Sequence, residues 1–300
     1  MKRLLVSLIS ALLVCLCLVC FTACSCQEEP AAVPEAPPVE ETPEQGGGEE
    51  QPEDVQPYVP RYVEFGLFPQ VLKEQSVTVS QSANAQGYYL GSDDKLYVKV
   101  VADPWNEGFK FSNGVDIING EEYYFQLQPI TWQILSEENG VCLMVCRDIL
   151  INKSFDNAGN DYAQSELREW LNNEFINSAF TQSEKELIQL TNVDSIQDKV
   201  FLLNYLDVVS EAYGYNSDLN ALDSFRQKKT SDYSRANGAW MATSEGYFGN
   251  GNWWLRSAKQ ESNQEVKSVY SIGNVDSYRV SDCALGVVPV LRVELPQSNG

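Results

Sequence analysis

The sequence predicts an α+β fold, in which a mainly antiparallel, twisted sheet carries two or three helices grouped on one side. Apolar residues alternate with polar ones between positions 62 and 146, and again from position 239 to 294, as in half-buried strands. Between positions 165 and 214 they recur at spacings of three and four, the period of an amphipathic helix. Strands, then helices, then strands again indicate helices packed beside an antiparallel sheet.

The first half of the predicted domain consists of strands. The first alternating segment ends near Pro69, as expected of an edge strand, because proline cannot donate a backbone hydrogen bond to a neighbour. Asn139-Gly140 stands between two apolar runs and is a strong signal for a hairpin turn. Strands are expected at 62–70, 77–79, 96–100, 123–135 and 141–146.

The middle of the chain predicts three short helices and one short strand at 199–203. The first helix begins near Ser165, because the large apolar residues of 167–175 form one stripe. The second follows the segment 181–184, which has the spacing of a capping box. The third is expected between Asn204 as its N-cap and Gly214, which ends it.

The last third returns to the strand pattern, with strands expected at 240–243, 253–257, 266–272, 277–280 and 286–294. Trp253 and Trp254 form its most distinctive stretch. Neighbouring side chains on a strand point to opposite faces, so we expect one tryptophan in the core and the other at or near the surface.

Four side chains of this region are candidates for ligand binding: Trp253, Trp254, Arg256 and Tyr270. Tryptophan and tyrosine rings give stacking faces for sugars and anchors for proteins. Arg256 can stack on Trp254, meet an acidic ligand, or form an internal salt bridge that locks the strand. The internal salt bridge is the favoured interpretation.

The N-terminus predicts export. A basic start at Lys2-Arg3 precedes an apolar run that ends in Thr22-Ala23-Cys24, the pattern of a secretory signal peptide. The segment 21–24 resembles the bacterial lipobox, in which the cysteine receives a diacylglycerol before cleavage, although Phe21 stands where leucine is usual. An ordinary cleaved signal and an uncleaved membrane anchor are the alternatives. The apolar run is at the short end for a spanning helix, which favours lipidation of Cys24.

Residues 25–60 hold eight prolines, a triple glycine and ten acidic residues without a basic one. Such a segment cannot bury enough apolar surface to fold, so we expect a disordered spacer. The predicted division is a lipoprotein signal peptide at 1–23, lipidated Cys24 with its linker at 24–60, one globular domain at 61–296 and a tail at 297–300. The protein is therefore expected outside the cytoplasm, anchored to the cell membrane by a lipid.

Composition excludes several classes of function. The formal charge is −21, which repels nucleic-acid backbones, so no nucleic-acid partner is expected. The chain has no histidine, which rules out histidine-dependent catalytic triads and histidine-based metal sites.

The cysteines of the globular part give a second candidate chemistry. Cys142 and Cys146 lie four residues apart on one predicted strand, about 13 Å, so they cannot bridge each other or share a metal. Cys283 is a pairing candidate for either one. The favoured interpretation is that these cysteines are small, buried apolar residues.

Two oxygen-rich runs are candidates for calcium binding, since calcium takes carboxylate and amide oxygens. Neither run has the spacing of a recognised calcium loop. Turn and cap duty is therefore the expectation, and no cofactor is predicted. The runs are Asp156, Asn157, Asn160 and Asp161, and Asn216, Asp218, Asn220 and Asp223.

Six motifs occur together over nearly the whole globular part: Phe-Gly-Leu-Phe-Pro-Gln at 65–70, aromatic and Pro-Ile-Thr-Trp segments at 123–132, Leu-Arg-Glu-Trp-Leu-Asn-Asn at 167–173, Lys-Val-Phe-Leu-Leu at 199–203, Trp-Trp-Leu-Arg-Ser at 253–257 and Gly-Val-Val-Pro-Val-Leu at 286–291. In these motifs the chain resembles an uncharacterised domain family of lipoproteins and surface proteins of Gram-positive gut bacteria. The family usually has an arginine where this chain has Val288.

In layout, the final third also resembles C-type-lectin-like folds, including the formylglycine-generating enzyme superfamily. This resemblance implies ligand binding or, less often, copper-dependent oxidation by paired cysteines. We therefore expect a surface-tethered lipoprotein with a non-catalytic domain that binds a glycan or a cell-surface protein. An oxidase of the formylglycine-generating type and a structural surface spacer are the alternatives.

Overall fold

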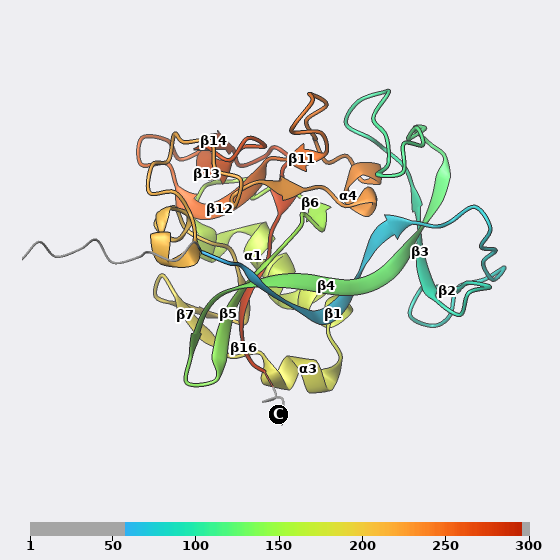
Figure 1. Cartoon of the computed structure of the whole chain (residues 1–300), viewed down its shortest axis with the longest axis horizontal. Helices are drawn as coiled ribbons and strands as arrows, with labels where there is room; N and C mark the ends of the chain where they lie inside the picture. Colours follow the sequence, from blue (N-terminus) through green and yellow to red (C-terminus); the bar gives the residue numbers. More distant parts are fainter. Residues whose placement is uncertain (1–57, 296–300) are drawn as a thin grey trace, which may run out of the picture. The chain divides into compact units, whose positions relative to one another are not determined.

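A computed structural model describes residues 58–295, which are mostly antiparallel sheet with a few short helices (Figure 1). The predicted α+β class is therefore confirmed. The predicted signal peptide, Cys24, nearly all of the linker and the tail at 297–300 lie outside the described residues. Within 58–295, no helix is both long and apolar enough to cross a membrane.

The larger sheet is built on one long strand, β4, which pairs antiparallel with β1, β3 and β5. The turn between β4 and β5 is the predicted hairpin, because Asn139 and Gly140 both have positive φ, at 54° and 81°. The sheet contains β1 (Arg61–Leu72), β2 (Tyr89–Leu90), β3 (Leu96–Val101), β4 (Glu122–Glu138), β5 (Val141–Cys146), β9 (Val200–Phe201) and β16 (Val290–Glu294).

The second sheet is formed mainly by the last third of the chain, in the order β14, β13, β12, β15, β6. Its strands are antiparallel except where β15 runs parallel to β12, with Gly286 opposite Trp253. The sheet contains β6 (Ile151–Asn152), β12 (Trp253–Ala258), β13 (Glu265–Val269), β14 (Val275–Arg279) and β15 (Gly286–Val287).

The predicted strand at 286–294 is divided between the two sheets, which corrects the sequence expectation. Its first half, β15, lies in the second sheet, whereas its second half, β16, pairs with β5 and β9 in the larger one. The break falls at Pro289, which has no N–H to donate and whose carbonyl instead accepts from Cys146 N at 2.9 Å. The terminal segment thus joins the two sheets.

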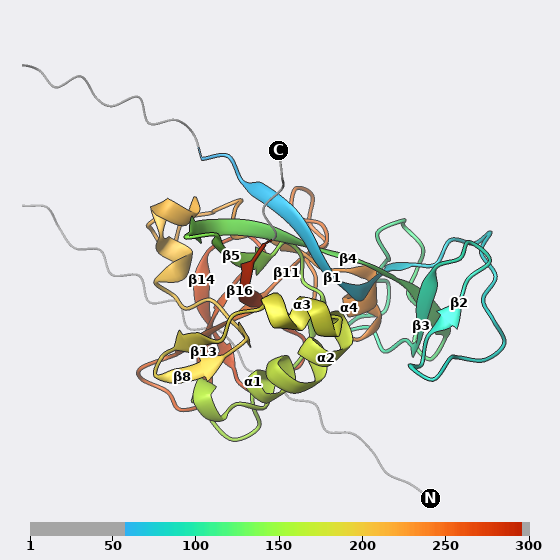
Figure 2. The same ribbon diagram turned by 90° about the horizontal axis from the view of Figure 1, so that it is seen from below.

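The helical middle follows the predicted capping signals. The Ser165 hydroxyl accepts from Arg168 N at the start of α1, and Thr181 with Glu184 forms the complete capping box of α3. Figure 2 shows α1, α2 and α3 lying together. The elements are η1 (Tyr162–Gln164), α1 (Glu166–Trp170), the π-helical η2 (Leu171–Phe175), α2 (Ile176–Ala179) and α3 (Gln182–Leu187).

The third predicted helix, between Asn204 and Gly214, is two separate 3₁₀ turns, η3 (Asp207–Val209) and η4 (Glu211–Tyr213). Both predicted end signals are nevertheless present. Asn204 Oδ1 accepts from Asp207 N at 2.8 Å, and Gly214 ends η4 in a left-handed conformation. The nine residues between these signals are short for one stable helix.

The remaining errors concern short elements. The predicted strand at 77–79 is reduced to one isolated bridge between Val79 and Gly91. The segment 240–243 is not a strand: Trp240 N donates to Ala284 O and Ala242 N to Asn250 O, outside any strand ladder. The sequence analysis missed α4 (Asp232–Ala236), which has only five residues. The remaining short strands are β7 (Thr191–Val193), β8 (Ile196–Asp198), β10 (Lys228–Lys229) and β11 (Asn250–Gly251).

Candidate functional site

Trp253 and Trp254 are both fully buried, so the expectation that one of them lies at the surface is wrong. Trp253 Nε1 donates to Arg226 O at 3.0 Å, and Trp254 Nε1 donates to Lys153 O at 2.8 Å. The alternation rule is correct, but β12 is the central strand of its sheet and both of its faces are covered. Neither indole offers a stacking face to a ligand.

Arg256 forms the internal ion pairs that the sequence favoured. Its Nε donates to Asp194 Oδ2 at 2.7 Å, while Nη1 donates to Asp207 Oδ2 at 3.1 Å and to Leu202 O at 2.6 Å. The residue is 9% exposed. Arg256 therefore ties β12 to two loops of the helical middle.

Tyr270 is half-buried and lies just after β13, with its ring centroid 5.1 Å from that of Tyr278. Tyr278 Oη in turn accepts from Asn252 Nδ2 at 2.9 Å. Burial raises the pKa of Tyr270 above its ordinary value. Of the four residues predicted to bind a ligand, only Tyr270 keeps substantial exposed surface, so the structure does not assemble them into one site.

Cys142 and Cys146 are buried and unpaired, as the favoured interpretation predicted, whereas Cys283 is unpaired and exposed. Burial raises the pKa of the Cys142 thiol, and it raises the pKa of Cys146 to about 12. A reactive cysteine needs a lowered pKa, because the thiolate is the nucleophile and the metal ligand. Both thiols of β5 are therefore inert.

The oxygen-rich runs have the predicted turn and cap duty. Asp156 Oδ2 accepts from Ala158 N and Gly159 N, and Asp223 Oδ2 accepts from Asn216 N at 2.9 Å. The loop at 216–223 also encloses the fully buried guanidinium of Arg226. Arg226 donates to the carbonyl oxygens of Asn216, Asp218 and Gly273.

A different site lies where the end of β1, the segment after β5, β10 and α4 converge. There the surface is hollowed into a cleft of about 440 Å³, within the size range of small-ligand sites. We name it the Arg235 cleft. Its lining includes Gln70, Arg147, Lys229, Thr230, Arg235 and Phe248.

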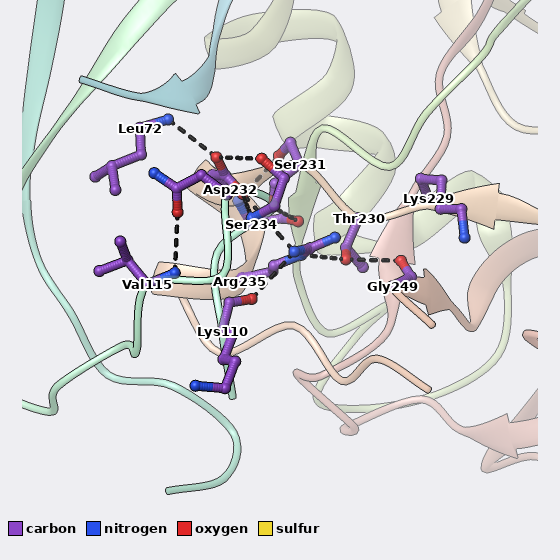
Figure 3. A network of polar contacts seen from close by, with 12 residues as sticks. Leu72, Lys110, Val115, Lys229, Thr230, Ser231, Asp232, Ser234, Arg235 and Gly249 are labelled. Carbon is purple, nitrogen blue, oxygen red and sulfur yellow. Dashed lines mark hydrogen bonds and ion pairs between the residues drawn. The ribbon is translucent and has the colours of Figure 1, made fainter. Parts of the chain in front are cut away.

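Asp232 fixes the framework of the Arg235 cleft (Figure 3). Its Oδ2 accepts from Leu72 N at 3.1 Å and from Ser112 Oγ at 2.9 Å, and its Oδ1 accepts from Ser112 N at 2.6 Å. Ser231 caps α4 through Ser234 N and donates its hydroxyl hydrogen to Leu150 O. The Asp232 carboxylate thus accepts the hydrogen bonds that join α4 to the end of β1 and to the loop before β4.

Arg235 is 3% exposed and is held at two of its nitrogens. Nε donates to Thr230 Oγ1 at 2.9 Å, and Nη1 donates to Lys110 O at 3.0 Å (Figure 3). Nη2 makes no hydrogen bond with any residue of 58–295, and it is accessible to solvent. A buried, oriented guanidinium therefore keeps one free donor.

Lys229 and the ring of Phe248 lie beside this guanidinium. The Phe248 ring centroid is 6.0 Å from Arg235 Cζ, and 43% of the residue is exposed. A Cβ on Gly249 would lie 2.6 Å from Arg235 Nη2 and 3.7 Å from Lys229 Cδ, so both cationic side chains flank the same glycine. Burial lowers the pKa of Lys229, and the charge of Arg235 lowers it further.

Of these two cations, Arg235 forms one long ion pair with a buried carboxylate, and Lys229 forms none within 58–295. Asp148 pairs with Arg147 at 2.8 Å, and Asp232 Oδ1 is 3.8 Å from Arg235 Nη1. Lys229 forms no ion pair with any described residue; its ammonium donates to the Phe248 carbonyl. The arrangement can receive a negative group next to an apolar face.

This site was not predicted from the sequence. Its local signal is Ser231 followed by Asp232, a capping serine with an acidic residue in the first turn; Thr230 separates them from a pair of lysines. That signal marks a helix start but not a cleft. The other walls come from β1, from the segment after β5 and from the loop at 248, which are distant in the sequence.

Comparison with known proteins gives one match. The model of a family described as a domain of unknown function, DUF6273, matches residues 139–295, which is more than half of the chain. The match includes Lys229, Arg235 and Phe248 as well as the tryptophan pair. No curated protein and no solved structure matches the chain.

Proposed function

Because the chain belongs to the DUF6273 family, whose function is unknown, we propose from the site itself that the protein is a non-catalytic binding module with its ligand in the Arg235 cleft. The observation that carries this proposal is the free Nη2 of a buried, oriented arginine beside the exposed ring of Phe248. Preorganised donors beside an aromatic face are typical of ligand sites, because little ordering is needed on binding.

The C-type-lectin-like architecture is part of this proposal. Two features support it: the tryptophan-bearing strand β12 lies in the core, and the terminal strand β16 lies between β5 and β9 in the larger sheet. Fold alone does not decide function, so the cleft carries the argument.

The surroundings in which the module works are proposed from the N-terminal sequence. A lipid on Cys24 and an acidic, proline-rich linker would hold the domain outside the cytoplasm at the membrane surface. A glycan or a cell-surface protein is the class of partner that such a domain meets. Nucleic acid is not proposed, because the formal charge is −21.

The two alternative functions have less support. An oxidase of the formylglycine-generating type would need accessible cysteines of low pKa, but Cys142 and Cys146 are buried with raised pKa values. A structural spacer would need no preorganised cleft. Neither alternative accounts for the unpartnered donor of Arg235.

The test is a glycan and surface-protein binding screen with the full chain and two pairs of variants. Phe248→Ala and Lys229→Gln alter the Arg235 cleft. Tyr205→Ala and Lys267→Gln are matched controls in a separate surface hollow of about 380 Å³; Tyr205 is 42% exposed, against 43% for Phe248.

We expect the two cleft variants to weaken binding of a retained ligand by about tenfold or more, because each removes a direct contact, while the controls bind as the parent does. Binding that is unchanged in Phe248→Ala and Lys229→Gln, or that is lost only in the controls, would place the site elsewhere.

A further inference from the structure

We propose that the ligand of the Arg235 cleft is a short acidic sugar, in which a ring-borne carboxylate meets Arg235 and Lys229 and the ring face lies against Phe248. This inference rests on the proposed function, since it names the chemical class of ligand for the same site. Three features of the cleft support it: its charge, its aromatic wall and its uncharged polar groups.

The charge of the cleft calls for an anion. Arg235 and Lys229 flank Gly249, and Lys229 has no carboxylate partner among the described residues. Two neighbouring cations repel each other, and a carboxylate placed between them would remove that repulsion. The free Nη2 of Arg235 and the remaining ammonium hydrogens of Lys229 can donate to its two oxygens, and such charge-assisted bonds are the strong ones.

The aromatic wall favours a sugar ring over an extended acidic chain. Phe248 presents a partly exposed ring directly beside the two cations. The C–H face of a pyranose can pack on such a ring while the substituent carboxylate reaches the adjacent guanidinium. A charged side chain on a flexible peptide lacks this rigid apolar face, so Phe248 would contribute little to its binding.

Two glutamine side chains complete the fit. Gln70 donates from Nε2 to the carbonyl oxygens of Gln128 and Pro129, which orients its amide and leaves Oε1 without a partner in the described chain. The side chain of Gln128 makes no hydrogen bond within 58–295 and also lines the cleft. Hydroxyl groups both donate and accept, so oriented and free amides are suitable partners for a sugar.

The overall charge limits the length of the ligand. Residues 58–295 hold 32 acidic against 19 basic residues, so a long polyanion that left the cleft would meet mostly acidic side chains. Repulsion between exposed charges is screened beyond about 8 Å at physiological ionic strength. A single acidic sugar unit held in the cleft therefore avoids most of the repulsion from the protein's carboxylates. We therefore assign a monosaccharide or disaccharide, or the terminal unit of a chain.

The experiment is calorimetric titration of the full chain with three probes. The first is a disaccharide containing one uronic acid, the second is the same disaccharide with its carboxylate reduced to the alcohol, and the third is a glutamate-containing dipeptide. Each probe is tested on the parent chain, on Lys229→Gln and Phe248→Ala, and on the control Lys267→Gln. Lys229 and Phe248 are chosen because the buried Arg235 also supports the fold.

We expect the acidic disaccharide to bind the parent at least tenfold more tightly than the reduced disaccharide or the dipeptide. Lys229→Gln should lower its affinity about tenfold and Phe248→Ala severalfold, with no change in Lys267→Gln. That pattern supports the inference.

Other patterns overturn it and separate it from the proposed function. Equal binding of the acidic and reduced disaccharides, still weakened by Phe248→Ala, would leave a sugar site but remove its acidic specificity. Preferential binding of the dipeptide would replace the sugar by an acidic peptide. If none of the probes binds, the inference fails, whereas the proposed function fails only if the wider screen also retains no ligand that depends on Phe248 or Lys229.

Discussion

Arg235 donates a hydrogen bond from Nε to Thr230 Oγ1 at 2.9 Å, and the Thr230 hydroxyl donates one to the Gly249 carbonyl at 2.9 Å. This relay sets the plane of the guanidinium and joins it to the loop that carries Phe248. Orientation of the binding groups in the Arg235 cleft therefore depends on a hydroxyl that is itself buried, with only 4% of Thr230 exposed.

Replacing Thr230 by valine should destabilise the protein and weaken ligand binding. Valine has a similar shape but leaves Arg235 Nε without its acceptor, while the Gly249 carbonyl keeps only the hydrogen bond from the backbone N–H of residue 230. We expect a loss of about 1–3 kcal/mol in the free energy of unfolding. Urea denaturation measures the change. Thr131→Val is the control, because the Thr131 hydroxyl makes no hydrogen bond within the described residues; its effect should stay within about 0.5 kcal/mol. Equal effects of both substitutions would contradict the relay.

Arg256 should behave as a structural residue without a part in binding. Arg256→Met leaves Leu202 O and the Asp207 carboxylate without their shared donor, and we expect a loss of about 3–5 kcal/mol in unfolding free energy. Asp194→Asn should cost less than about 1 kcal/mol, because the Asp194 side chain is 59% exposed. A folded Arg256→Met protein should bind ligand as the parent does; a selective loss of binding at unchanged stability would return Arg256 to the list of ligand contacts.

The sequence predicted those parts of the fold that depend on local chemistry. The hairpin at Asn139-Gly140 and the caps at Ser165 and Thr181 are set by a few neighbouring residues, and the structure has all three. Arg256 was also interpreted correctly, because a guanidinium on a largely apolar strand requires internal acceptors.

The errors arise where a second layer of the protein decides the outcome. Alternation along β12 correctly separates Trp253 from Trp254, but it cannot reveal that both faces of that strand are covered. The Arg235 cleft is formed by segments brought together only by the fold, and α4 is too short to give a periodic signal. Candidate contacts chosen for aromatic character therefore included core residues and omitted Phe248.

Lys228 gives the protein a specific pH dependence. Burial lowers the pKa of its ammonium to about 8, whereas an unfolded lysine titrates at about 10.4. Between about pH 8 and pH 10.4, Lys228 is protonated in the unfolded chain but largely neutral in the folded one. The free energy of unfolding therefore rises with pH in this range, by up to about 1.4 kcal/mol per pH unit. Cys146 acts in the opposite direction, since burial raises its pKa to about 12 from about 8.5 in the unfolded chain.

The variant Lys228→Met separates the contribution of Lys228 to the pH dependence of stability from that of Cys146. Methionine removes the buried charge at similar volume, so the variant should be more stable than the parent at pH 7, by about 3 kcal/mol at most. The difference should shrink steadily from pH 8 to pH 10 in urea denaturation series measured at each pH. A difference that does not change with pH would show that Lys228 does not titrate in this range.

The three cysteines of the described chain should differ in reactivity. In the native protein we expect an alkylating reagent to modify Cys283, which is exposed, and to leave Cys142 and Cys146 unmodified. Peptide mapping by mass spectrometry identifies each position. The same treatment in denaturant should modify all three and serves as the control. Rapid native labelling of Cys146 would contradict its burial and would revive the oxidase alternative.

The loop at 216–223 should not bind calcium. Its inward carbonyl oxygens already accept hydrogen bonds from the guanidinium of Arg226, whose Nε also lies 3.1 Å from Asp223 Oδ2. A cation therefore already occupies the centre of the loop, and a calcium ion would have to displace it. Removing Arg226 leaves the buried Asp223 carboxylate without its ion-pair partner and deprives the carbonyl oxygens of Asn216 and Gly273 of the guanidinium, so Arg226→Leu should lose about 3–5 kcal/mol of unfolding free energy.

For the parent chain, we expect the same melting temperature with calcium and with a chelator, measured by differential scanning calorimetry. Asp156→Asn serves as the control for the other oxygen-rich run, in which the carboxylate accepts hydrogen bonds from Ala158 N and Gly159 N; its melting temperature should likewise be the same with calcium as with a chelator. A calcium-dependent rise in the melting temperature of the parent would contradict turn and cap duty, because a ligand that binds only the folded state must stabilise it. Loss of that rise in Asp156→Asn would then assign the ion to the first run, and its persistence would assign it to the loop around Arg226.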